Sequence, residues 1–200
     1  MDVARYDAEW IASMLSAERA RETDPFGLLR WAGLLAGGTV VDYGAGPGFF
    51  TLPAAEVVGS SGQVVAVDLE PRMRDEVARR AQLLGCQNIE VLDPEGAKRL
   101  PAGVASLVIA ALLLHDLSAE ERKAVLPELR RLCAPDGRLL VVEWVAPGGL
   151  EGPSTHNRFA AADLTALLRR HGFRPGRPQH LGAKYFALTA RRNVDGRSGA

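Results

Sequence analysis

The sequence predicts an α/β fold in which one doubly wound, mainly parallel sheet carries helices on both faces. Short aliphatic runs alternate with helical patterns along most of the 200 residues, which is typical of such sheets. Runs such as 139–142, LLVV, are apolar without interruption, as strands buried on both faces are. The hydrophobic share of 47% and the charged share of 24% are those of a folded globular protein, and the length suits one domain.

The N-terminal part predicts two helices before the first strand. Residues 4–20 are expected to form a helix because four apolar side chains fall on one face of it: Trp10, Ile11, Met14 and Leu15. A second, shorter helix should begin at Pro25, a residue suited to a first helical position, and run to about Leu35.

Five strand runs follow, separated by helices and turns. They lie at residues 39–43, 63–68, 88–92, 106–111 and 138–145. Helices are expected between them at three places: about ten residues ending at Gly59, residues 71–84, and Ser118 to Cys133. The last of these opens with S-x-x-E, a capping box, and Pro127 should kink it or break it in two. The APDG run at 134–137 is typical of a turn.

The C-terminal part should complete the sheet. A loop rich in glycine and proline at 146–153 leads into a helix at 160–171, which Gly172 ends. Two further strand-like runs, near 176–181 and 184–190, close the domain.

The chain is expected to form one domain with two appendages. We assign residues 1–24 to an N-terminal helical lid, residues 25–192 to the main domain and residues 193–200 to a disordered tail. Tyr6 and Trp10 in the first segment would either cover a cavity or dock the helix on the core.

The charge balance and the cysteines exclude several classes of protein. Lys plus Arg and Asp plus Glu both number 24, so no basic excess indicates nucleic-acid binding. Cys86 and Cys133 form no C-x-x-C pair, which argues against a disulfide scaffold or a thiolate metal site. The apolar stretch 107–114 is too short to cross a bilayer. We expect a cytoplasmic protein without bound metal or membrane contact, either a monomer or a homodimer.

A glycine-rich loop follows the first strand and is paired with an acid on the second. Residues 41–48 read VDYGAGPG, and glycines at a strand-to-helix turn let a ligand lie against bare backbone. Asp68 ends the next strand, where a carboxylate can accept hydrogen bonds from both hydroxyls of a ribose. The spacing G-x-G-x-G is one residue tighter than the G-x-G-x-x-G of dinucleotide sites, which disfavours a nicotinamide-dependent oxidoreductase.

In these residues the chain resembles the class I S-adenosylmethionine-dependent methyltransferases, whose first motif is a hydrophobic strand ending in an acid and followed by G-x-G-x-G. The run VDLEPRM at 67–73 is similar to the family's second motif, in which the acid holds the ribose. The runs LHDL at 114–117 and LCAPDGRL at 132–139 are similar to motifs of the ubiquinone/menaquinone-biosynthesis branch. The resemblance implies a Rossmann-like sheet of seven strands with the last one antiparallel, and S-adenosyl-L-methionine as cofactor. The implied cofactor contacts are Asp42, Gly44, Ala45, Gly46, Gly48, Asp68 and Leu69.

The adenine side of the implied site departs from the family pattern. Gly96 stands where an acid usually contacts the adenine amino group, so that Asp93 or Glu95 would have to substitute from a shifted loop. Ser106 stands where the family often has an aspartate at the start of the fourth strand. Because of these departures, a catalytically inactive protein that binds S-adenosylmethionine is the alternative to an active enzyme.

Three residues near the expected carboxyl edge of the sheet are candidates for catalysis. His115 follows the fourth strand and is the first candidate for a general base, although a structural hydrogen bond at a helix entry is the simpler interpretation. Glu143, on the fifth strand, either faces the substrate cavity or forms a salt bridge at an edge. His156 lies in the next loop and either contacts the substrate or is a solvated loop residue.

The function predicted from these residues is methyl transfer from S-adenosylmethionine to a small-molecule acceptor. Because the methyl group on a sulfonium is already activated, the protein mainly has to hold the acceptor in line and exclude water. A phenol, a hydroxyl or an acidic carbon would also need a base, whereas a thiolate or a free amine would not. The motifs therefore leave the identity of the acceptor open.

Overall fold

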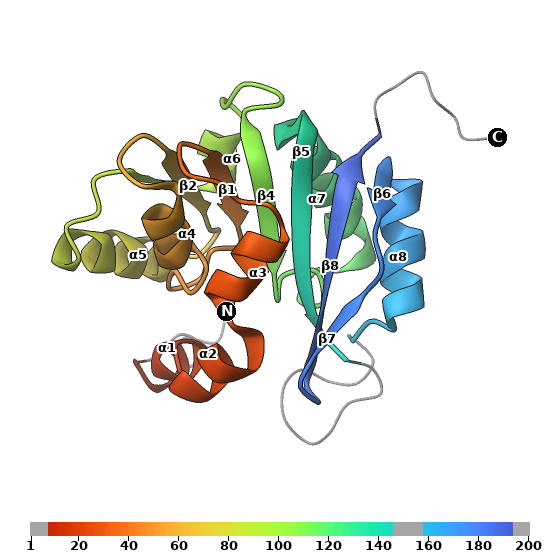
Figure 1. The fold of residues 1–200 in the computed structure, drawn as a ribbon, viewed down its shortest axis with the longest axis horizontal. Helices are drawn as coiled ribbons and strands as arrows, with labels where there is room; N and C mark the ends of the chain where they lie inside the picture. Colours follow the sequence, from red (N-terminus) through yellow and green to blue (C-terminus); the bar gives the residue numbers. More distant parts are fainter. Residues whose placement is uncertain (1–7, 146–157, 194–200) are drawn as a thin grey trace.

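The computed structural model describes residues 8–145 and 158–193, which form a single mixed sheet with helices on both faces (Figure 1). The order of the strands is β3-β2-β1-β4-β5-β8-β6, and β7 pairs with β8 outside this path. The strands are β1 (Thr39–Tyr43), β2 (Gln63–Val67), β3 (Ile89–Leu92), β4 (Ala105–Ala111), β5 (Cys133–Trp144), β6 (Phe173–Pro175), β7 (Gln179–Leu181) and β8 (Tyr185–Arg192).

The directions of the strands confirm the predicted fold class. Strands β1 to β5 are parallel, and β8 runs antiparallel to β5. The strand expected near 176–181 is shorter in the structure, where only β7 falls within it, and β6 just before it was not expected; both are antiparallel to β8. Pro178 lies between them, and proline has no N–H to donate to a ladder.

The helices cover the two faces of the sheet and one of its ends. They are α1 (Ala8–Met14), α2 (Ala17–Thr23), α3 (Pro25–Trp31), α4 (Thr51–Val58), α5 (Pro71–Leu83), α6 (Pro94–Ala97), α7 (Ala119–Leu132) and α8 (Ala161–Arg170). None of the helices in the described part of the chain is both long and apolar enough to span a bilayer.

The single helix expected at 4–20 is wrong: the described part of it consists of α1 and α2. The side chain of Ser16 accepts a hydrogen bond of 3.2 Å from the backbone N–H of Arg19, and this N-cap starts a new helix. The apolar stripe from Trp10 to Leu15 ends before Ser16, so it does not define how far the helix extends.

Of the two outcomes expected at Pro127, a kink or a break, the break does not occur, and α7 continues through this residue as one helix. Both hydrogen bonds of the predicted capping box between Ser118 and Glu121 are present at its start. Leu126 and Leu129, on either side of the proline, are fully buried. Their burial stabilises the helix enough to offset the one backbone hydrogen bond that proline cannot make.

Strand β5 begins at Cys133, earlier than the sequence predicts. Ala105 pairs with Cys133 and Leu107 pairs with Arg138, so the register with β4 shifts between the two positions. Residues 134–137, expected as a separate turn, lie within the strand as this irregularity. A proline and a glycine in one short segment are accommodated here by a bulge.

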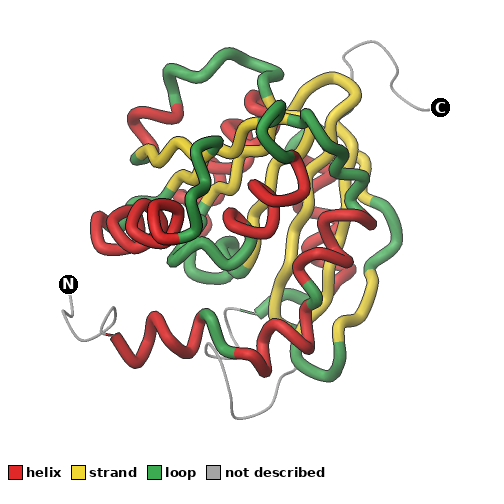
Figure 2. Tube along the Cα trace, turned by 60° about the vertical axis from the view of Figure 1, so that its left-hand side comes forward, coloured by secondary structure: helices red, strands yellow, loops and turns green. Residues whose placement is uncertain are grey.

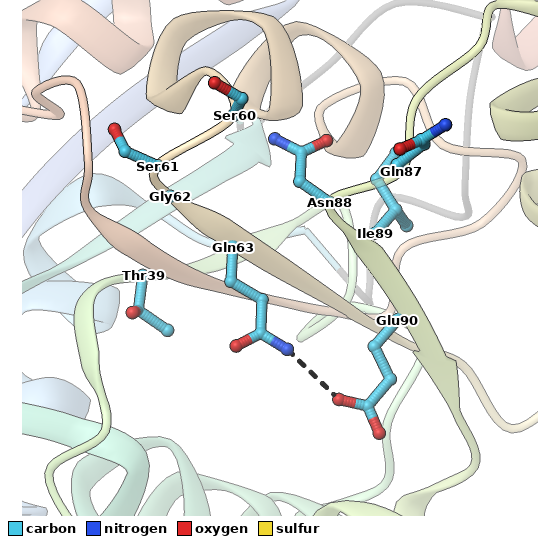
Figure 3. A pocket seen from close by; sticks show the side chains of 9 residues that line it. All are labelled: Thr39, Ser60, Ser61, Gly62, Gln63, Gln87, Asn88, Ile89 and Glu90. Carbon is cyan, nitrogen blue, oxygen red and sulfur yellow. Dashed lines mark hydrogen bonds between the residues drawn. The ribbon is translucent and has the colours of Figure 1, made fainter.

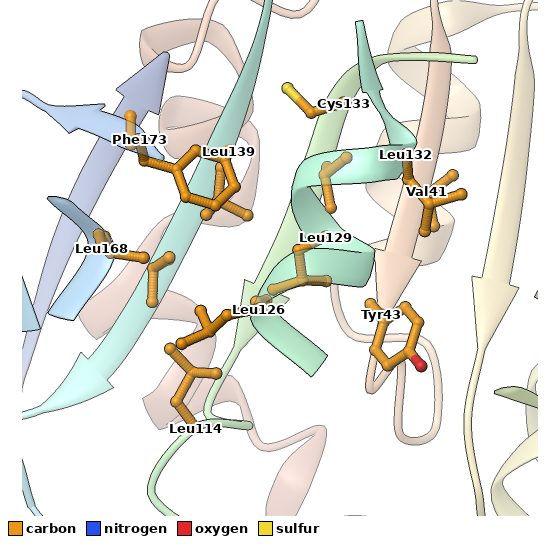
Figure 4. Close-up of a cluster of buried hydrophobic side chains, with 14 of the residues drawn as sticks. Val41, Tyr43, Leu114, Leu126, Leu129, Leu132, Cys133, Leu139, Leu168 and Phe173 are labelled. Carbon is orange, nitrogen blue, oxygen red and sulfur yellow. The ribbon is translucent and has the colours of Figure 1, made fainter. Parts of the chain in front are cut away.

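The core consists of two main layers, one on each face of the sheet. Val40 and Val41 are adjacent on β1 and belong to different layers, because successive side chains of a strand point to opposite faces. Figure 4 shows the layer in which the leucines of α7 pack near Val41 and Leu139. The other layer lies beneath α3 and α4. Both faces are therefore buried, as the uninterrupted apolar strands predicted.

Candidate cofactor and catalytic site

The glycine-rich loop at 44–48 is a turn that requires glycine. The φ angles of Gly44, Gly46 and Gly48 are 78°, 54° and 88°, in the region that residues with side chains rarely adopt. The backbone N–H groups of Gly44 and Ala45 donate to the carbonyl of Val67, at 2.7 and 3.0 Å, which ties the loop to the end of β2. The loop therefore lies at the carboxyl edge of the sheet.

Asp68 is bonded directly to this loop. The N–H of Gly46 donates to Asp68 Oδ2 at 2.7 Å, and the N–H of Glu70 donates to Oδ1 at 2.9 Å. Burial raises the pKa of Asp68 above its ordinary value, while the two backbone N–H groups act in the opposite direction. Each oxygen keeps a second lone pair. The carboxylate can therefore still accept hydrogen bonds from a ligand lying on the loop.

Asp42 and Leu69 flank these residues. Asp42 is buried at the end of β1, and Thr51 Oγ1 donates to its Oδ2 at 2.6 Å. Burial raises the pKa of Asp42 to about 6, and Asp68 acts in the same direction. Leu69 is 79% exposed, so a large apolar side chain stands in solvent next to the acid of β2.

The two acids expected on the adenine side have local partners. Asp93 caps the start of α6 by accepting a hydrogen bond of 2.7 Å from the N–H of Gly96. Glu95 forms an exposed ion pair of 2.6 Å with Lys98. Ser106 donates to the carbonyl of Thr39, the first residue of β1, at 3.0 Å. It therefore lies at the amino edge of the sheet, away from the glycine loop.

His115 and Glu143, 28 residues apart in sequence, form a buried pair. His115 Nδ1 lies 2.7 Å from Glu143 Oε2. The backbone N–H groups of Leu114 and His115 donate to Glu143 Oε1 at 2.8 and 3.3 Å. Leu112, at the turn after β4, has a φ of 54°, which is unusual for leucine and redirects the chain towards Glu143. Glu143 is therefore neither at a sheet edge nor exposed to a cavity.

The contact between Glu143 Oε2 and His115 Nδ1 links the tautomer of the imidazole to the charge of the carboxyl group. With Glu143 ionised and the imidazole neutral, Nδ1 carries the hydrogen and Nε2 keeps its lone pair. Nε2 lies 3.7 Å from Asp116 Oδ2. The third catalytic candidate, His156, lies outside the described residues.

The N-terminal helices lie across the carboxyl edge of the sheet (Figures 1 and 2). A Cβ atom added to Gly46 would lie 3.0 Å from Met14 Cε, so α1 ends directly against the glycine loop. Lys184, in the turn before β8, lies 2.7 Å from Glu18 and 3.4 Å from Glu22 of α2. Residues 8–24, the described part of the segment assigned to a lid, thus lie at the site.

Sequence reasoning missed Arg19, which α2 brings to the same place. Its guanidinium carbon lies 4.1 Å from the centre of the Phe49 ring, just after the glycine loop. Nothing in the sequence distinguishes it from the other 20 arginines, because its position depends on how α2 packs.

Two hollows lie elsewhere than around Asp68 and His115. One, of about 510 Å³, is at the amino ends of β1 to β3, where Gln63 donates to Glu90 at 3.3 Å (Figure 3). The other, of about 910 Å³, runs between α2, α3, α4 and the end of α5 and reaches Gly48. Neither is lined by Asp68 or His115.

Comparison with known proteins agrees with this geometry. Residues 40–137 match the methyltransferase domain family. The crystal structure of a SAM-dependent methyltransferase from Aquifex aeolicus is 30% identical, has a TM-score of 0.83, and covers 92% of this chain and 98% of that one. The chain belongs to the S-adenosylmethionine-dependent methyltransferases. S-adenosyl-L-methionine is accordingly its cofactor.

Other members of the methyltransferase family differ in what they act on. The ubiquinone/menaquinone biosynthesis C-methyltransferase of Hahella chejuensis is 32% identical over 58% of this chain and 47% of that protein. The arsenite methyltransferase of Halobacterium salinarum is 28% identical over 72% of this chain and 39% of that protein. The chain thus spans less than half the length of these curated relatives. The 1,6-didemethyltoxoflavin-N1-methyltransferase of Burkholderia thailandensis, solved with S-adenosylhomocysteine, is 25% identical, with a TM-score of 0.67, and covers 88% of this chain and 79% of that one.

The residues present fit the cofactor of the methyltransferase family. The glycine loop offers a cradle that a Cβ at position 46 would fill, and Asp68 stands beside it with free lone pairs. In addition, the buried Nε of Arg19 has no hydrogen-bond partner within the described residues. A charged, polar ligand lying on this loop would meet each of these groups.

Proposed function

We propose that this protein transfers a methyl group from S-adenosylmethionine to a small organic molecule whose acceptor atom loses a proton, with His115 as the base. The observation that carries the proposal is the bond between the N–H of Gly46 and Asp68. It joins the bare backbone of the loop and the acid of β2 into one surface at the edge of the sheet where the His115–Glu143 pair also lies.

The cofactor is proposed to lie on the glycine loop. When bound, it supplies a methyl group activated by the sulfonium charge. Asp68 would accept hydrogen bonds from the ribose, with Gly44, Ala45 and Gly48 forming the backbone surface and Leu69 an apolar wall. Asp42 would face the charged end of the cofactor, and Asp93 or Glu95 the adenine.

His115 would take a proton from the acceptor through Nε2. Glu143 acts through His115, so we assign it as a positioning residue that fixes the tautomer and the place of the ring. His156 remains a proposed substrate contact. The fully buried Glu143 and the nearly buried imidazole hold this proton acceptor away from bulk water.

An organic acceptor is favoured over arsenite, which would need thiols at the site. Cys133 is buried at the first position of β5, at the amino edge of the sheet, and burial raises the pKa of its thiol to about 11. Cys86 follows α5. Neither thiol is near the His115–Glu143 pair.

Residues 1–24 are proposed to act as a lid on the domain at 25–192. Two contacts support this: Met14 lies against Gly46 of the cofactor loop, and the ion pairs of Lys184 attach α2 to the turn before β8. A ligand on the loop would require Met14 to move.

The test is calorimetric titration of the wild type and of a Gly46→Val variant with S-adenosylmethionine and S-adenosylhomocysteine. We expect the wild type to bind both, and Gly46→Val to bind on the order of 100-fold more weakly, because the new side chain fills the cradle. The matched control is Gly85→Val: Gly85 has a similar φ of 69°, and a Cβ there meets nothing within 4 Å. Equal binding by the two variants, or preference of the wild type for NADH, would refute the proposal.

The alternative is a protein that binds the cofactor without catalysing transfer, which Gly96 at the adenine position favours. Binding without methylation of any phenol, hydroxyl or acidic-carbon compound would support this alternative. Transfer that is lost in Gly46→Val would exclude it.

A further inference from the structure

Arg19 is a half-buried cation that the described residues leave incompletely paired. Its Nη1 donates to the carbonyl of Met14 at 2.9 Å, and its guanidinium lies over the Phe49 ring. Its Nε is buried and has no hydrogen-bond partner within the described residues. A buried donor without an acceptor is unfavourable, so this arrangement favours an acceptor supplied by a ligand.

Asp42 is a buried anion close enough to influence Arg19. Burial lowers the pKa of Arg19 to about 10, while Asp42 and Tyr185 act in the opposite direction. No ion pair joins Arg19 and Asp42 in the described structure, and Asp42 is bonded to Thr51 instead. A positive and a negative group thus stand near one another at the glycine loop, each partly deprived of water and neither neutralised by the other.

The methionine part of the proposed cofactor carries the complementary charges, a carboxylate and an ammonium on one carbon. We propose that Arg19 binds the carboxylate of this amino-acid end while Asp42 faces its ammonium, so that α2 forms one wall of the cofactor site. This inference rests on the proposed function and adds a residue outside the methyltransferase motifs. A guanidinium suits the task because its planar fork matches a carboxylate.

The position of α2 would let Arg19 contact only the amino-acid end of the cofactor. Met14 lies against Gly46 and Arg19 lies over Phe49, so both N-terminal residues lie next to the glycine loop. Asp68, on the other side of the loop, is bonded to Gly46 and would hold the ribose. Different residues would therefore bind the amino-acid end and the nucleoside end of the cofactor.

The experiment compares two ligands that differ only in the amino-acid end. S-adenosylhomocysteine has it, whereas 5′-methylthioadenosine keeps the nucleoside and lacks it. In Arg19→Met, which keeps an apolar stem of similar length, we expect the affinity for S-adenosylhomocysteine to fall about 10- to 100-fold. The affinity for 5′-methylthioadenosine should change by less than about twofold. Arg21→Met is the control, because Arg21 is an exposed arginine on the same helix.

Each other outcome has a distinct meaning. If Arg19→Met weakens both ligands equally, or weakens neither, Arg19 does not bind the carboxylate and the inference is overturned. If the wild type binds neither ligand, the proposed function itself fails. Should Arg19→Met not fold, as judged by circular dichroism, Arg19→Lys provides the same comparison: a selective, smaller loss for S-adenosylhomocysteine supports the inference, and an equal change for both ligands overturns it.

Discussion

Among single residues, Glu143 has the most demanding environment. It is fully buried in β5 and accepts hydrogen bonds from the backbone of Leu114, the backbone of His115 and the imidazole of His115. A buried carboxylate is stable only with such partners. Because two of the donors are main-chain groups, Glu143 fixes the course of the loop after β4 as well as the orientation of the imidazole.

Glu143→Gln tests this positioning role. The amide oxygen of glutamine can still accept hydrogen bonds from the backbone. The amide NH₂ would face Nδ1 of His115 and force the hydrogen of the neutral imidazole onto Nε2. We expect kcat to fall by roughly 100-fold because the base loses its lone pair. KM and the Kd for S-adenosylhomocysteine should stay within about twofold.

Glu128→Gln is the control for this measurement, since Glu128 is a carboxylate paired with Arg131 on α7 and has no bond to His115. An unchanged kcat in Glu143→Gln, or an equal loss in Glu128→Gln, would contradict the assignment of Glu143.

At the scale of elements, α2 is the helix whose attachment bears on the site. Lys184 pairs with Glu18 of α2, which also carries Arg19. Met14, at the end of α1 just before α2, contacts the glycine loop. The side chains of Lys184 and Glu18 are 26% and 64% exposed, so their ion pair is partly hydrated. Such pairs contribute less than about 1 kcal/mol, which makes the attachment weak enough to open.

Lys184→Met should loosen α2 without unfolding the domain. We expect amide hydrogen exchange in α2 to accelerate by up to about fivefold, and the melting temperature to change by less than about 2 °C. The control is Lys123→Met, which removes a more exposed ion pair with Glu120 on α7. Unchanged exchange in α2, or acceleration spread evenly over the chain, would argue against the lid.

The elements also show where sequence patterns lose accuracy. The capping box at Ser118 was correctly predicted, because a cap depends on residues three positions apart. The break at Pro127 was not, since the burial of Leu126 and Leu129 outweighs the local preference of proline. The division of the first helix at Ser16 depends on one side-chain bond that an apolar stripe does not register.

At the scale of the whole molecule, the strand order assembles the site. β1 lies between β2 and β4, and β5 lies next to β4. β1, β2 and β4 therefore end at one edge of the sheet, and the segments that follow them begin there, beside Glu143, although they are far apart in sequence. Because these strands are parallel, Ser106 and the hollow lined by Gln63, which lie at strand starts, are at the opposite edge.

The unfolding free energy of the whole molecule should depend on pH through the titration of Asp42. Its pKa is about 6 in the folded protein against an ordinary value of 3.8, so the folded state binds the proton more tightly than the unfolded chain. Stability must then fall as pH rises from about 4 to about 6, by an amount on the order of 3 kcal/mol from this group. Above about pH 6 the loss is complete.

Asp42→Asn removes this titration while keeping an oxygen for Thr51. Urea unfolding at several pH values should show the variant gaining stability relative to the wild type between pH 4 and 6, with a constant difference above that. Contributions of other groups cancel in this difference. Parallel stability curves over the whole range would show that Asp42 does not titrate there.

The sequence by itself determined the apolar strands, the glycine loop with Asp68, and the family to which these motifs point. These features depend on periodicity, on backbone conformations that only glycine adopts easily, and on residues close together in the chain. Only the tertiary structure decided that Glu143 is the partner of His115, that Ser106 is remote from the site, and that Arg19 reaches the glycine loop. Each of these depends on which segments the sheet order and the packing of α2 bring together, and no local pattern encodes such distant contacts.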